Sequence, residues 1–369
     1  MTLTEREQEI VRHLRRDPLI GSLALAEALG TTRAAVNVHL SNLGKKGVIL
    51  GRGYVLSEQP AVVVIGGANM DVKARSARPA VAGTSNPGSG SIVPGGVARN
   101  IAENLARLGT RTHLVAAIGS DGLGEQVLAA TSGAGVHVEH VRRTAGATGT
   151  YTAVLDASGE LVVAVADMAA TDGLSPEDVG RARDLIAAAG LVVLDGNLAP
   201  ATLAFALDLA TSAGVRVVLE PVSVPKAEGV AHLIEQQRPL FAVTPNRDEL
   251  AALTGLPTGT TRQLERAVAA LHGRGVAHVW VRLGERGSLL SGVGEQTYLD
   301  AVPTDVLDVT GAGDAMLAAF CHALLDGDDP AAAAAFGHAA AALTVASAHT
   351  VRPDLTDRLV RALLKEELV

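Results

Sequence analysis

The segment with the clearest chemical potential is a glycine-containing loop that ends in an aspartate just before an apolar stretch. It reads Asp308-Val309-Thr310-Gly311-Ala312-Gly313-Asp314 and leads into residues 315–325. Its glycines let backbone N–H groups converge without obstruction by Cβ atoms, and a following helix would add the positive end of its dipole. The loop is therefore predicted to bind an anion such as a phosphate.

Asp314 would lie at the first turn of that helix, beside the bound anion. A carboxylate next to a phosphate is unfavourable unless it has a task, and the task that fits is removal of a proton from an attacking hydroxyl. The alternative is an ordinary helix N-cap after a glycine-rich turn, because Gly-x-Gly alone is weak evidence. The catalytic interpretation therefore needs support from other segments.

Polar residues follow two predicted strands. Asn69 and Asp71 come after the apolar run 61–65, and their spacing puts both side chains on one face of an extended chain. A carboxylate beside an amide suits a vicinal diol, and α/β sheets bind ligands at the carboxyl ends of their strands. Asn246 and Glu249 offer oxygen atoms to a Mg²⁺ ion that keeps most of its water, although the same pattern also caps helices.

The elements that must position these residues alternate along the chain. Continuous apolar runs indicate strands that are buried on both faces of a parallel sheet, and helical patterns lie between them. This alternation predicts a doubly wound α/β domain over residues 61–369. The strands are expected at 61–65, 191–194, 215–219, 241–244 and 278–283, and the helices include 99–108, 201–213 and 262–274.

Two segments interrupt the alternation. Residues 72–94 are rich in Gly, Ser and Pro, and residues 149–166 alternate around Asp156-Ala157-Ser158-Gly159, which is a hairpin signal. Together they are predicted to form a small separate sheet that serves as a lid. The exposed edge of such a sheet could pair between two copies, so we expect a homodimer through the lid.

Residues 1–58 have the order of a winged helix-turn-helix. Thr4 and Glu7 form a capping box, Ser22 is predicted to cap a second helix, and Thr31 or Thr32 a third. A short hairpin follows, with its turn at residues 51–53. The alternative is a three-helix interaction module without a DNA partner. The predicted DNA-contacting residues are Arg33, Asn37, His39 and Asn42 on the third helix and Arg52 on the wing.

Charge and composition limit the partners. The net charge is −8, but residues 1–60 hold eight Lys/Arg and six Asp/Glu, so any nucleic acid should contact this segment. The single cysteine, Cys321, excludes an intrachain disulfide and a cysteine-based metal cluster. Neither a signal peptide nor an apolar run long enough to span a bilayer is recognisable. We therefore expect a cytoplasmic protein without membrane contact.

The chain resembles the PfkB or ribokinase family over about residues 61–360. Two separated signatures carry the resemblance, namely residues 308–314 and Pro94-Gly95-Gly96-Val97-Ala98-Arg99-Asn100. The resemblance implies that Asp314 is the catalytic base and that the backbone of Gly311, Ala312 and Gly313 stabilises the transferred phosphoryl group. It further implies ATP as the donor, Mg²⁺ held through water by Asn246 and Glu249, and Asp308 as a candidate K⁺ ligand.

The same resemblance implies a nucleotide site in the C-terminal half. A strand-turn at residues 281–287 would approach the phosphates and the ribose, although it could be a plain turn between strands. His338 matches a region that lines the adenine pocket, although a lone His on an apolar helix is more often packed in a core. The residues assigned to the nucleotide are Asn246, Glu249, Arg282, Gly284, Gly287, Thr310, Gly311, Gly313 and His338.

The combination of the segments 68–73, 84–88, 95–104 and 149–152 is similar to the pseudouridine kinases, which phosphorylate a nucleoside at its 5′-hydroxyl. Val97 stands where ribokinase usually carries Lys. The alternatives are another ribonucleoside, ribose, or a transcription regulator that uses the kinase fold as a ligand sensor. The residues assigned to the acceptor are Asn69, Asp71, Lys73, Ser85, Asn86, Gly95, Gly96, Asn100, Thr150, Tyr151, Glu160 and Asp167.

Overall fold

The computed structural model describes residues 3–51, 60–292 and 294–367. The chain divides into two compact units, Met1–Pro60 and Ala61–Val369. Most of the turn of the predicted wing hairpin, with Arg52, and its second strand lie outside the described residues.

The N-terminal unit contains three helices, α1 (Glu5–Arg16), α2 (Ser22–Ala28) and α3 (Arg33–Lys45). The predicted capping box is present, since Glu7 N donates to Thr4 Oγ1 at 3.2 Å and Thr4 N donates to Glu7 Oε2 at 2.8 Å. Thr32 caps α3 as predicted. Ile10, Leu14, Leu25, Val36 and Leu43 form the small core of this unit.

The prediction that Ser22 caps the second helix is wrong. Gly21 occupies the N-cap position, and Ser22 is the first residue of α2. The Ser22 hydroxyl instead accepts a hydrogen bond from Arg33 Nε at 3.2 Å. This side chain therefore joins α2 to the start of α3 and does not close its own helix.

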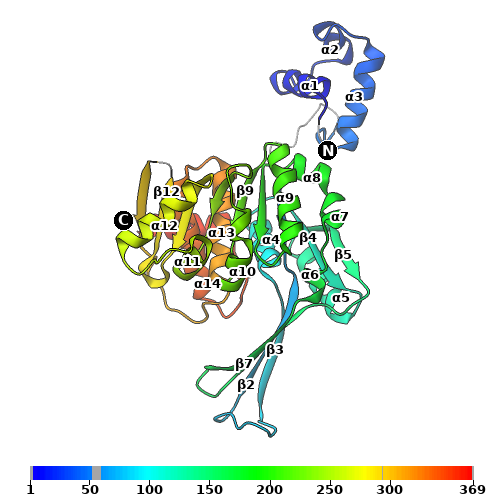
Figure 1. Ribbon diagram of the computed structural model, residues 1–369. Helices are drawn as coiled ribbons and strands as arrows, with labels where there is room; N and C mark the ends of the chain where they lie inside the picture. Colours follow the sequence, from blue (N-terminus) through cyan, green and yellow to red (C-terminus); the bar gives the residue numbers. More distant parts are fainter. Residues whose placement is uncertain (1–2, 52–59, 293, 368–369) are drawn as a thin grey trace. The chain divides into compact units, whose positions relative to one another are not determined.

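The second unit is built on a nine-stranded sheet with the order β13-β12-β11-β10-β9-β8-β1-β4-β5 (Figure 1). The seven strands from β5 to β11 run parallel, and β12 and β13 continue the sheet in antiparallel fashion. The strands are β1 (Val62–Ile65), β4 (Thr112–Gly119), β5 (His137–Thr144), β8 (Leu191–Asp195), β9 (Arg216–Glu220), β10 (Leu240–Val243), β11 (Val276–Arg282), β12 (Ser288–Gly292) and β13 (Glu295–Leu299).

Helices cover both faces of this sheet, as a doubly wound fold requires. Within β1, Val62 and Val64 join one apolar cluster, whereas Val63 and Ile65 join the other. The first cluster contains α4 (Val97–Arg107), α5 (Gly122–Gly133), α13 (Ala312–Asp326), α14 (Pro330–Val345) and α15 (Asp357–Glu367). The second contains α7 (Pro176–Gly180), α8 (Arg183–Ala187), α9 (Pro200–Ser212), α10 (Val224–Val230), α11 (Arg247–Thr254) and α12 (Thr261–His272). The short elements α6 (Ala169–Asp172), η1 (Ala231–Leu233) and η2 (Gly284–Arg286) complete the order.

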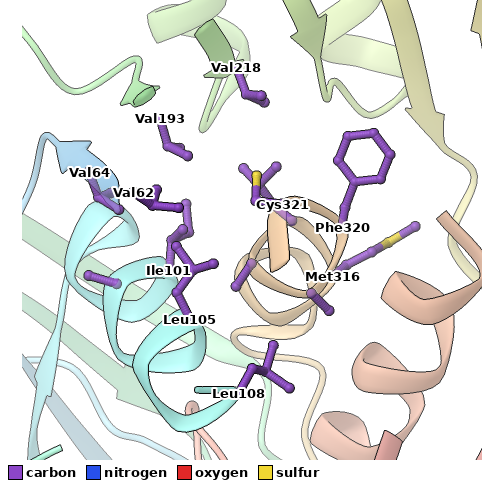
Figure 2. Packing of buried hydrophobic residues seen from close by; sticks show 14 of the residues in the cluster. Val62, Val64, Ile101, Leu105, Leu108, Val193, Val218, Met316, Phe320 and Cys321 are labelled. Carbon is purple, nitrogen blue, oxygen red and sulfur yellow. The ribbon is translucent and has the colours of Figure 1, made fainter. Parts of the chain in front are cut away.

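Helices α4 and α13 pack against each other in the first cluster. Figure 2 shows Ile101 and Leu105 of α4 near Val62 and Val64 of β1, with Cys321 and Phe320 of α13 alongside. This packing fixes the two helices whose N-termini carry the two signatures. The core of the fold therefore sets the spacing between the substrate-side and phosphate-side loops.

A separate four-stranded sheet, which we name the lid sheet, has the order β3-β2-β6-β7 and extends away from the main sheet (Figure 1). Its strands are β2 (Asn69–Ser76), β3 (Gly88–Gly95), β6 (Thr150–Leu155) and β7 (Leu161–Asp167). They come from the two segments that interrupt the strand–helix alternation, and β2 begins only a few residues after β1 ends.

All five strands predicted from apolar runs are present, but β4, β5, β12 and β13 of the main sheet were not predicted. β4 is fully buried although it begins with the polar residues Thr112 and His113, and β5 is a mostly polar, partly exposed strand at the sheet edge. Among the described residues, no helix combines the length and apolar character that crossing a bilayer requires.

Candidate active site

The glycine-rich loop forms the N-terminus of α13, at the carboxyl ends of the central strands. Gly311 is its N-cap with a φ of 81°, and a Cβ at this position would collide with the backbone oxygen of Thr350. Asp308 Oδ1 holds the loop by accepting bonds from Thr310 N at 2.8 Å and Thr310 Oγ1 at 2.6 Å. The first N–H groups of a helix have no intrahelical acceptors, so this geometry can bind an anion.

Asp314 lies in the first turn of α13 and is partly buried. Its Oδ2 accepts a hydrogen bond from Asn100 Nδ2 at 2.9 Å. Withdrawal from water raises the pKa of Asp314 to about 7; Asn100 and the Arg282 charge oppose this rise, and Glu220 and Asp195 add to it. A carboxylate with a pKa near the working pH is suited to accept a proton during a reaction.

The orientation of Asn100 is fixed by a residue that the sequence did not single out. Arg99 Nη1 donates to Asn100 Oδ1 at 3.2 Å and to Pro94 O at 3.2 Å, and Arg99 also forms an ion pair with Glu103. Because the amide oxygen of Asn100 is held by Arg99, its NH₂ group faces Asp314. Arg99 therefore acts on the candidate base through Asn100.

Arg282 lies directly against the glycine-rich loop of residues 308–314, which we name the phosphate loop. A Cβ on Gly313 would collide with Arg282 Nη1, so only glycine permits this approach. Arg282 Nη2 donates to Glu220 Oε1 at 2.7 Å and to Glu249 Oε2 at 3.2 Å, and both carboxylates are buried. One guanidinium thus faces two carboxylates on one side and the loop on the other.

Asn246 and Glu249 form a capping box at the start of α11. Asn246 Oδ1 accepts bonds from Asp248 N and Glu249 N, both at 2.9 Å, and Asn246 N donates to Glu249 Oε2 at 2.8 Å. The capping interpretation is therefore correct for the local structure. Glu249 also accepts a hydrogen bond from Arg282 and lies near the charge of Glu220.

A cavity of about 750 Å³ lies beside the phosphate loop. Five residues that the sequence assigned to the nucleotide line this cavity, namely Arg282, Gly284, Gly287, Gly313 and His338. Thr310, Gly311, Asn246 and Glu249 are outside its lining. The remaining wall is largely apolar and is formed by Ala301, Val302, Pro303, Val306, Val309, Ala312, Met316, Ala341, Ala342 and Val345, with Thr304 and Glu285.

His338 is held in one orientation within that wall. Its Nε2 lies 2.7 Å from Ser288 Oγ, which also accepts a bond from Trp280 Nε1 at 2.8 Å. Burial lowers the pKa of His338 to about 4, so the ring is neutral at pH 7. A neutral, partnered imidazole suits the wall of an apolar pocket.

The substrate-side residues Asn69 and Asp71 begin the lid strand β2. Asn69 Nδ2 donates to Asp71 Oδ1 at 2.7 Å, and the strand register pairs Asn69 with Gly95. Burial raises the pKa of Asp71, and the Asn69 hydrogen bond opposes that shift. Gly96 is the N-cap of α4, which places Gly95, Gly96 and Asn100 in sequence at the edge of the same site.

Asp195, at the end of β8, is fully buried behind this site and was not predicted to take part. Its Oδ2 accepts bonds from Gly67 N and Ala98 N, both at 2.9 Å. The carboxylate therefore ties the loop after β1 to the first turn of α4. Burial raises the pKa of Asp195 to about 6, against the effect of these hydrogen bonds.

Lys73 contacts the phosphate-side loop. Its Nζ lies 3.2 Å from Asp308 Oδ2 and 3.2 Å from Thr310 Oγ1. The residue that the sequence assigned to the acceptor thus joins the lid sheet to the loop that carries Asp314. It also places an ammonium beside the candidate K⁺ ligand.

The remaining lid residues are divided by strand register and by distance along the lid. Tyr151 pairs with Asp71 and shares its face with Lys73, whereas Thr150 and Asp167 align with Met70 on the opposite face. Ser85 and Asn86 lie in the exposed loop between β2 and β3, where Asn86 bonds to Val81 and Thr84. Glu160 lies in the β6–β7 hairpin turn. The structure does not bring Ser85, Asn86 or Glu160 to the other site residues within this chain.

In the N-terminal unit, the predicted DNA-contacting residues differ in exposure. Arg33 and Asn37 are exposed on α3, whereas His39 and Asn42 are only partly exposed. The Nδ1 atom of His39 is buried. The outward face of α3 is therefore formed by Arg33, Ala34, Asn37, Val38, Ser41 and Lys45.

Two known protein families match the two parts of the chain. Residues 59–357 match the pfkB family of carbohydrate kinases, and the chain belongs to this family. Residues 3–49 match a winged helix-turn-helix DNA-binding family. The fold class and the resemblance that the sequence predicted are both confirmed.

Individual relatives cover most of the chain. The uncharacterized sugar kinase YeiI of Escherichia coli (strain K12) is 35% identical over 356 residues, covering 96% of this chain and 97% of YeiI. The pseudouridine kinase of the same organism is 33% identical over 312 residues, covering 84% of this chain and 98% of that enzyme. The structure of Arabidopsis thaliana ribokinase complexed with ribose and ATP covers 83% of this chain and 99% of its own, with a TM-score of 0.73 and 29% identity.

Proposed function

We propose that this chain is an ATP-dependent kinase that phosphorylates the 5′-hydroxyl of pseudouridine. The observation that carries the proposal is the position of Asp314, which lies at the helix N-terminus of the phosphate loop and is held there by Asn100. Similarity to a pseudouridine kinase over 84% of the chain supports the choice of acceptor.

The arrangement supplies the parts that phosphoryl transfer needs. Asp314 would accept the proton of the 5′-hydroxyl as that oxygen attacks the γ-phosphorus in line, and ADP would leave. Backbone N–H groups of residues 312–314 and the Arg282 guanidinium would stabilise the negative charge on the transferred group. The chemistry is then mainly positioning and electrostatic stabilisation, with one proton moved to Asp314.

The residues around the two substrates fit these roles. The 750 Å³ cavity beside Gly313 has the largely apolar wall that a nucleoside base needs, and it includes His338, which Ser288 holds from behind. On the other side of Asp314, Asn69 and Asp71 would bind ribose hydroxyls, and Tyr151 shares the face of Asp71. Tyr151 is 37% exposed, which leaves its ring available to a uracil base.

Oxygen-rich groups near Arg282 fit Mg²⁺ bound through water. Glu220 and Glu249 offer carboxylates and Asn246 an amide, which is the ligand chemistry that Mg²⁺ accepts. The ion would neutralise part of the charge on the donor phosphates. Arg282 balances one of the two carboxylates, so the site would keep a net negative charge for the metal.

The candidate K⁺ site at Asp308 has a competitor within the chain. Asp308 Oδ1 is occupied by Thr310, and Oδ2 receives the Lys73 ammonium. A monovalent cation would have to share this carboxylate with Lys73. We therefore expect K⁺ to be dispensable for turnover.

The N-terminal unit supports a second role. Its match to a DNA-binding family and its exposed α3 residues suit a kinase that also binds DNA. Binding of the full chain to duplex DNA, measured by fluorescence anisotropy at several salt concentrations, tests this role. An affinity that falls steeply with salt supports DNA binding, and no binding at 50 mM salt contradicts it.

The identity of the acceptor is tested by an activity assay with six candidate substrates. Purified protein with ATP and Mg²⁺ is offered pseudouridine, uridine, adenosine, inosine, ribose and fructose, and ADP formation is measured. We expect the highest kcat/KM with pseudouridine. A higher value for another acceptor would correct the substrate but not the reaction, whereas no ADP with any of the six would favour a regulator that uses the fold as a sensor.

The remaining expectations concern location and assembly. The single cysteine, Cys321, is buried, which suits a reducing cytoplasm. One face of the lid sheet exposes Ile92, Val163 and Val165, which are 59%, 51% and 63% exposed. These apolar residues support a homodimer in which two lid sheets pack together.

A further inference from the structure

At the end of the sheet opposite the active site, three potential metal ligands meet between β4 and β5. His113 is the second residue of β4, and His137 begins β5 with Glu139 two residues later. One ligand atom from each of His113, His137 and Glu139 lies within 4.8 Å of the other two. Asp195 is at the carboxyl end of β8, whereas His113 and His137 lie at the amino ends of β4 and β5.

The buried member of the group has no partner. His113 is 7% exposed, and neither its Nδ1 nor its Nε2 has a hydrogen-bond partner among the described residues. A buried polar group without a hydrogen-bond partner destabilises a fold. A ligand bound by one of the ring nitrogens would remove this destabilisation.

His137 and Glu139 lie close to His113 and offer further ligand atoms. The rings of His113 and His137 stack with their centroids 4.3 Å apart, and His137 Nδ1 lies 3.4 Å from Glu139 Oε1. Burial lowers the pKa of His113 to about 4, so the ring is neutral at pH 7, which is the form that binds metals. Two imidazoles and a carboxylate are a frequent ligand set for zinc, with the fourth position left to water.

The backbone contributes to this arrangement. The pairing of β4 with β5 shifts between His113 and Val115, since Val115 faces His140 and not residue 139. A bulge of this kind redirects side chains, and bulges are common at sheet edges. Glu139 lies within the shifted segment, between His137 and His140.

We propose that His113, His137 and Glu139 form a binding site for one divalent transition-metal ion, Zn²⁺ in the first instance, that pins the edge strand β5 to β4. Zinc ligands in a tetrahedral site are separated by roughly 3.3 Å, given bonds of about 2.0–2.1 Å. Because the two rings are stacked, binding of one ion would require the partly exposed His137 ring and the exposed Glu139 side chain to rotate toward His113 until their ligand atoms reach that separation.

The binding test uses the full chain, freed of metal with a chelator and titrated with Co²⁺ and then Zn²⁺. We expect one Co²⁺ per chain with the visible absorption of a four-coordinate site, displaced by one equivalent of Zn²⁺. His137→Ala and Glu139→Ala should each weaken Zn²⁺ binding by at least about 10-fold, because even indirect contacts to a metal site have effects of that size. Both side chains are outside the core, so these variants should fold.

His140→Ala is the matched control, because His140 lies on the same strand but outside the group of three. It should bind Zn²⁺ as the wild type does. Zinc should also raise the melting temperature of the wild type and of His140→Ala but not of His137→Ala, since a ligand that binds only the native state stabilises it. Equal zinc affinity for the wild type and both ligand variants, or no binding at micromolar Zn²⁺, would overturn the proposal.

Discussion

At the scale of single residues, the chemistry of this protein depends on how Asp314 is held. Its pKa of about 7 results from opposing effects, with burial raising it and the Asn100 hydrogen bond lowering it. A base must be deprotonated to act. The rate is therefore expected to fall as the pH drops through about 7.

The first prediction concerns the Asn100 amide. Asn100→Ala removes a hydrogen bond that lowers the pKa of Asp314, so the pH at which kcat/KM reaches half its maximum should move upward. The activity lost at pH 7 should return in part near pH 9. Profiles of kcat/KM against pH, with Asn104→Ala from the same helix as control, test this shift. An unchanged midpoint in Asn100→Ala contradicts the assignment.

The second prediction concerns Arg282. Arg282→Met removes a cation from beside the phosphate loop and leaves Glu220 and Glu249 facing each other. We expect kcat/KM for ATP to fall about 100-fold, the usual result of losing one group that stabilises developing charge. Arg282→Lys should restore part of it, and the exposed Arg286→Met should have little effect. Circular dichroism checks that each variant is folded, and near-normal kinetics for Arg282→Met would assign this residue a structural role only.

At the scale of elements, the lid sheet has two different faces. Asp71, Lys73 and Tyr151 share one face by strand register, and Lys73 links it to the phosphate loop. Val163 and Val165 of β7 lie on the other face, with Ile92 of β3. The first face carries residues assigned to the acceptor, and the second carries the exposed apolar residues of the proposed dimer contact.

The third prediction tests the link made by Lys73. Lys73→Met should lower kcat/KM about five-fold, since a partly exposed ion pair contributes up to about 1 kcal/mol. Added K⁺ should restore part of the loss, whereas wild-type turnover should be the same in K⁺ and in tetramethylammonium. Arg75→Met is the control, because the Arg75 side chain donates to Ala157 O at 2.7 Å near the β6–β7 hairpin turn. Strong K⁺ dependence of the wild type would contradict this role for Lys73.

The fourth prediction concerns the outer face of the lid. Val165→Lys places a charge among the exposed apolar residues and should convert a dimer into a monomer, as measured by sedimentation velocity. Ala166→Lys, one residue along on the opposite face, should leave the dimer intact. A wild-type protein that sediments as a monomer at micromolar concentration contradicts the proposed assembly.

At the scale of the whole molecule, much of the fold follows from local sequence patterns. The apolar runs predicted five buried strands, and the glycine-rich loop before an apolar helix predicted the phosphate site at Asp314. Helix capping also followed from short-range patterns at Thr4 and Asn246. These features depend on residues that are close in sequence, which is why they could be predicted.

The unpredicted features depend on contacts between distant residues. Asp195 bonds to Gly67, 128 residues earlier, and Arg282 reaches Glu220 across 62 residues. Asp195 directly follows the apolar run 191–194, and this position at the end of a predicted buried strand was a signal that could have pointed to it. The tips of the lid could not be placed from sequence, because hairpin length and register, and not residue type, determine which side chains reach the site.

The central claim is that Asp314 is the base of a phosphoryl transfer from ATP to a nucleoside. The most direct measurement compares wild type and Asp314→Asn for pseudouridine phosphate formation, with ATP binding measured by calorimetry on the same samples. Asn keeps the size of the side chain but cannot accept the proton, so we expect turnover to fall at least about 1,000-fold, within the range general-base catalysis supplies. Binding of ATP and the melting temperature should be retained. Turnover by Asp314→Asn within ten-fold of the wild type would contradict the account.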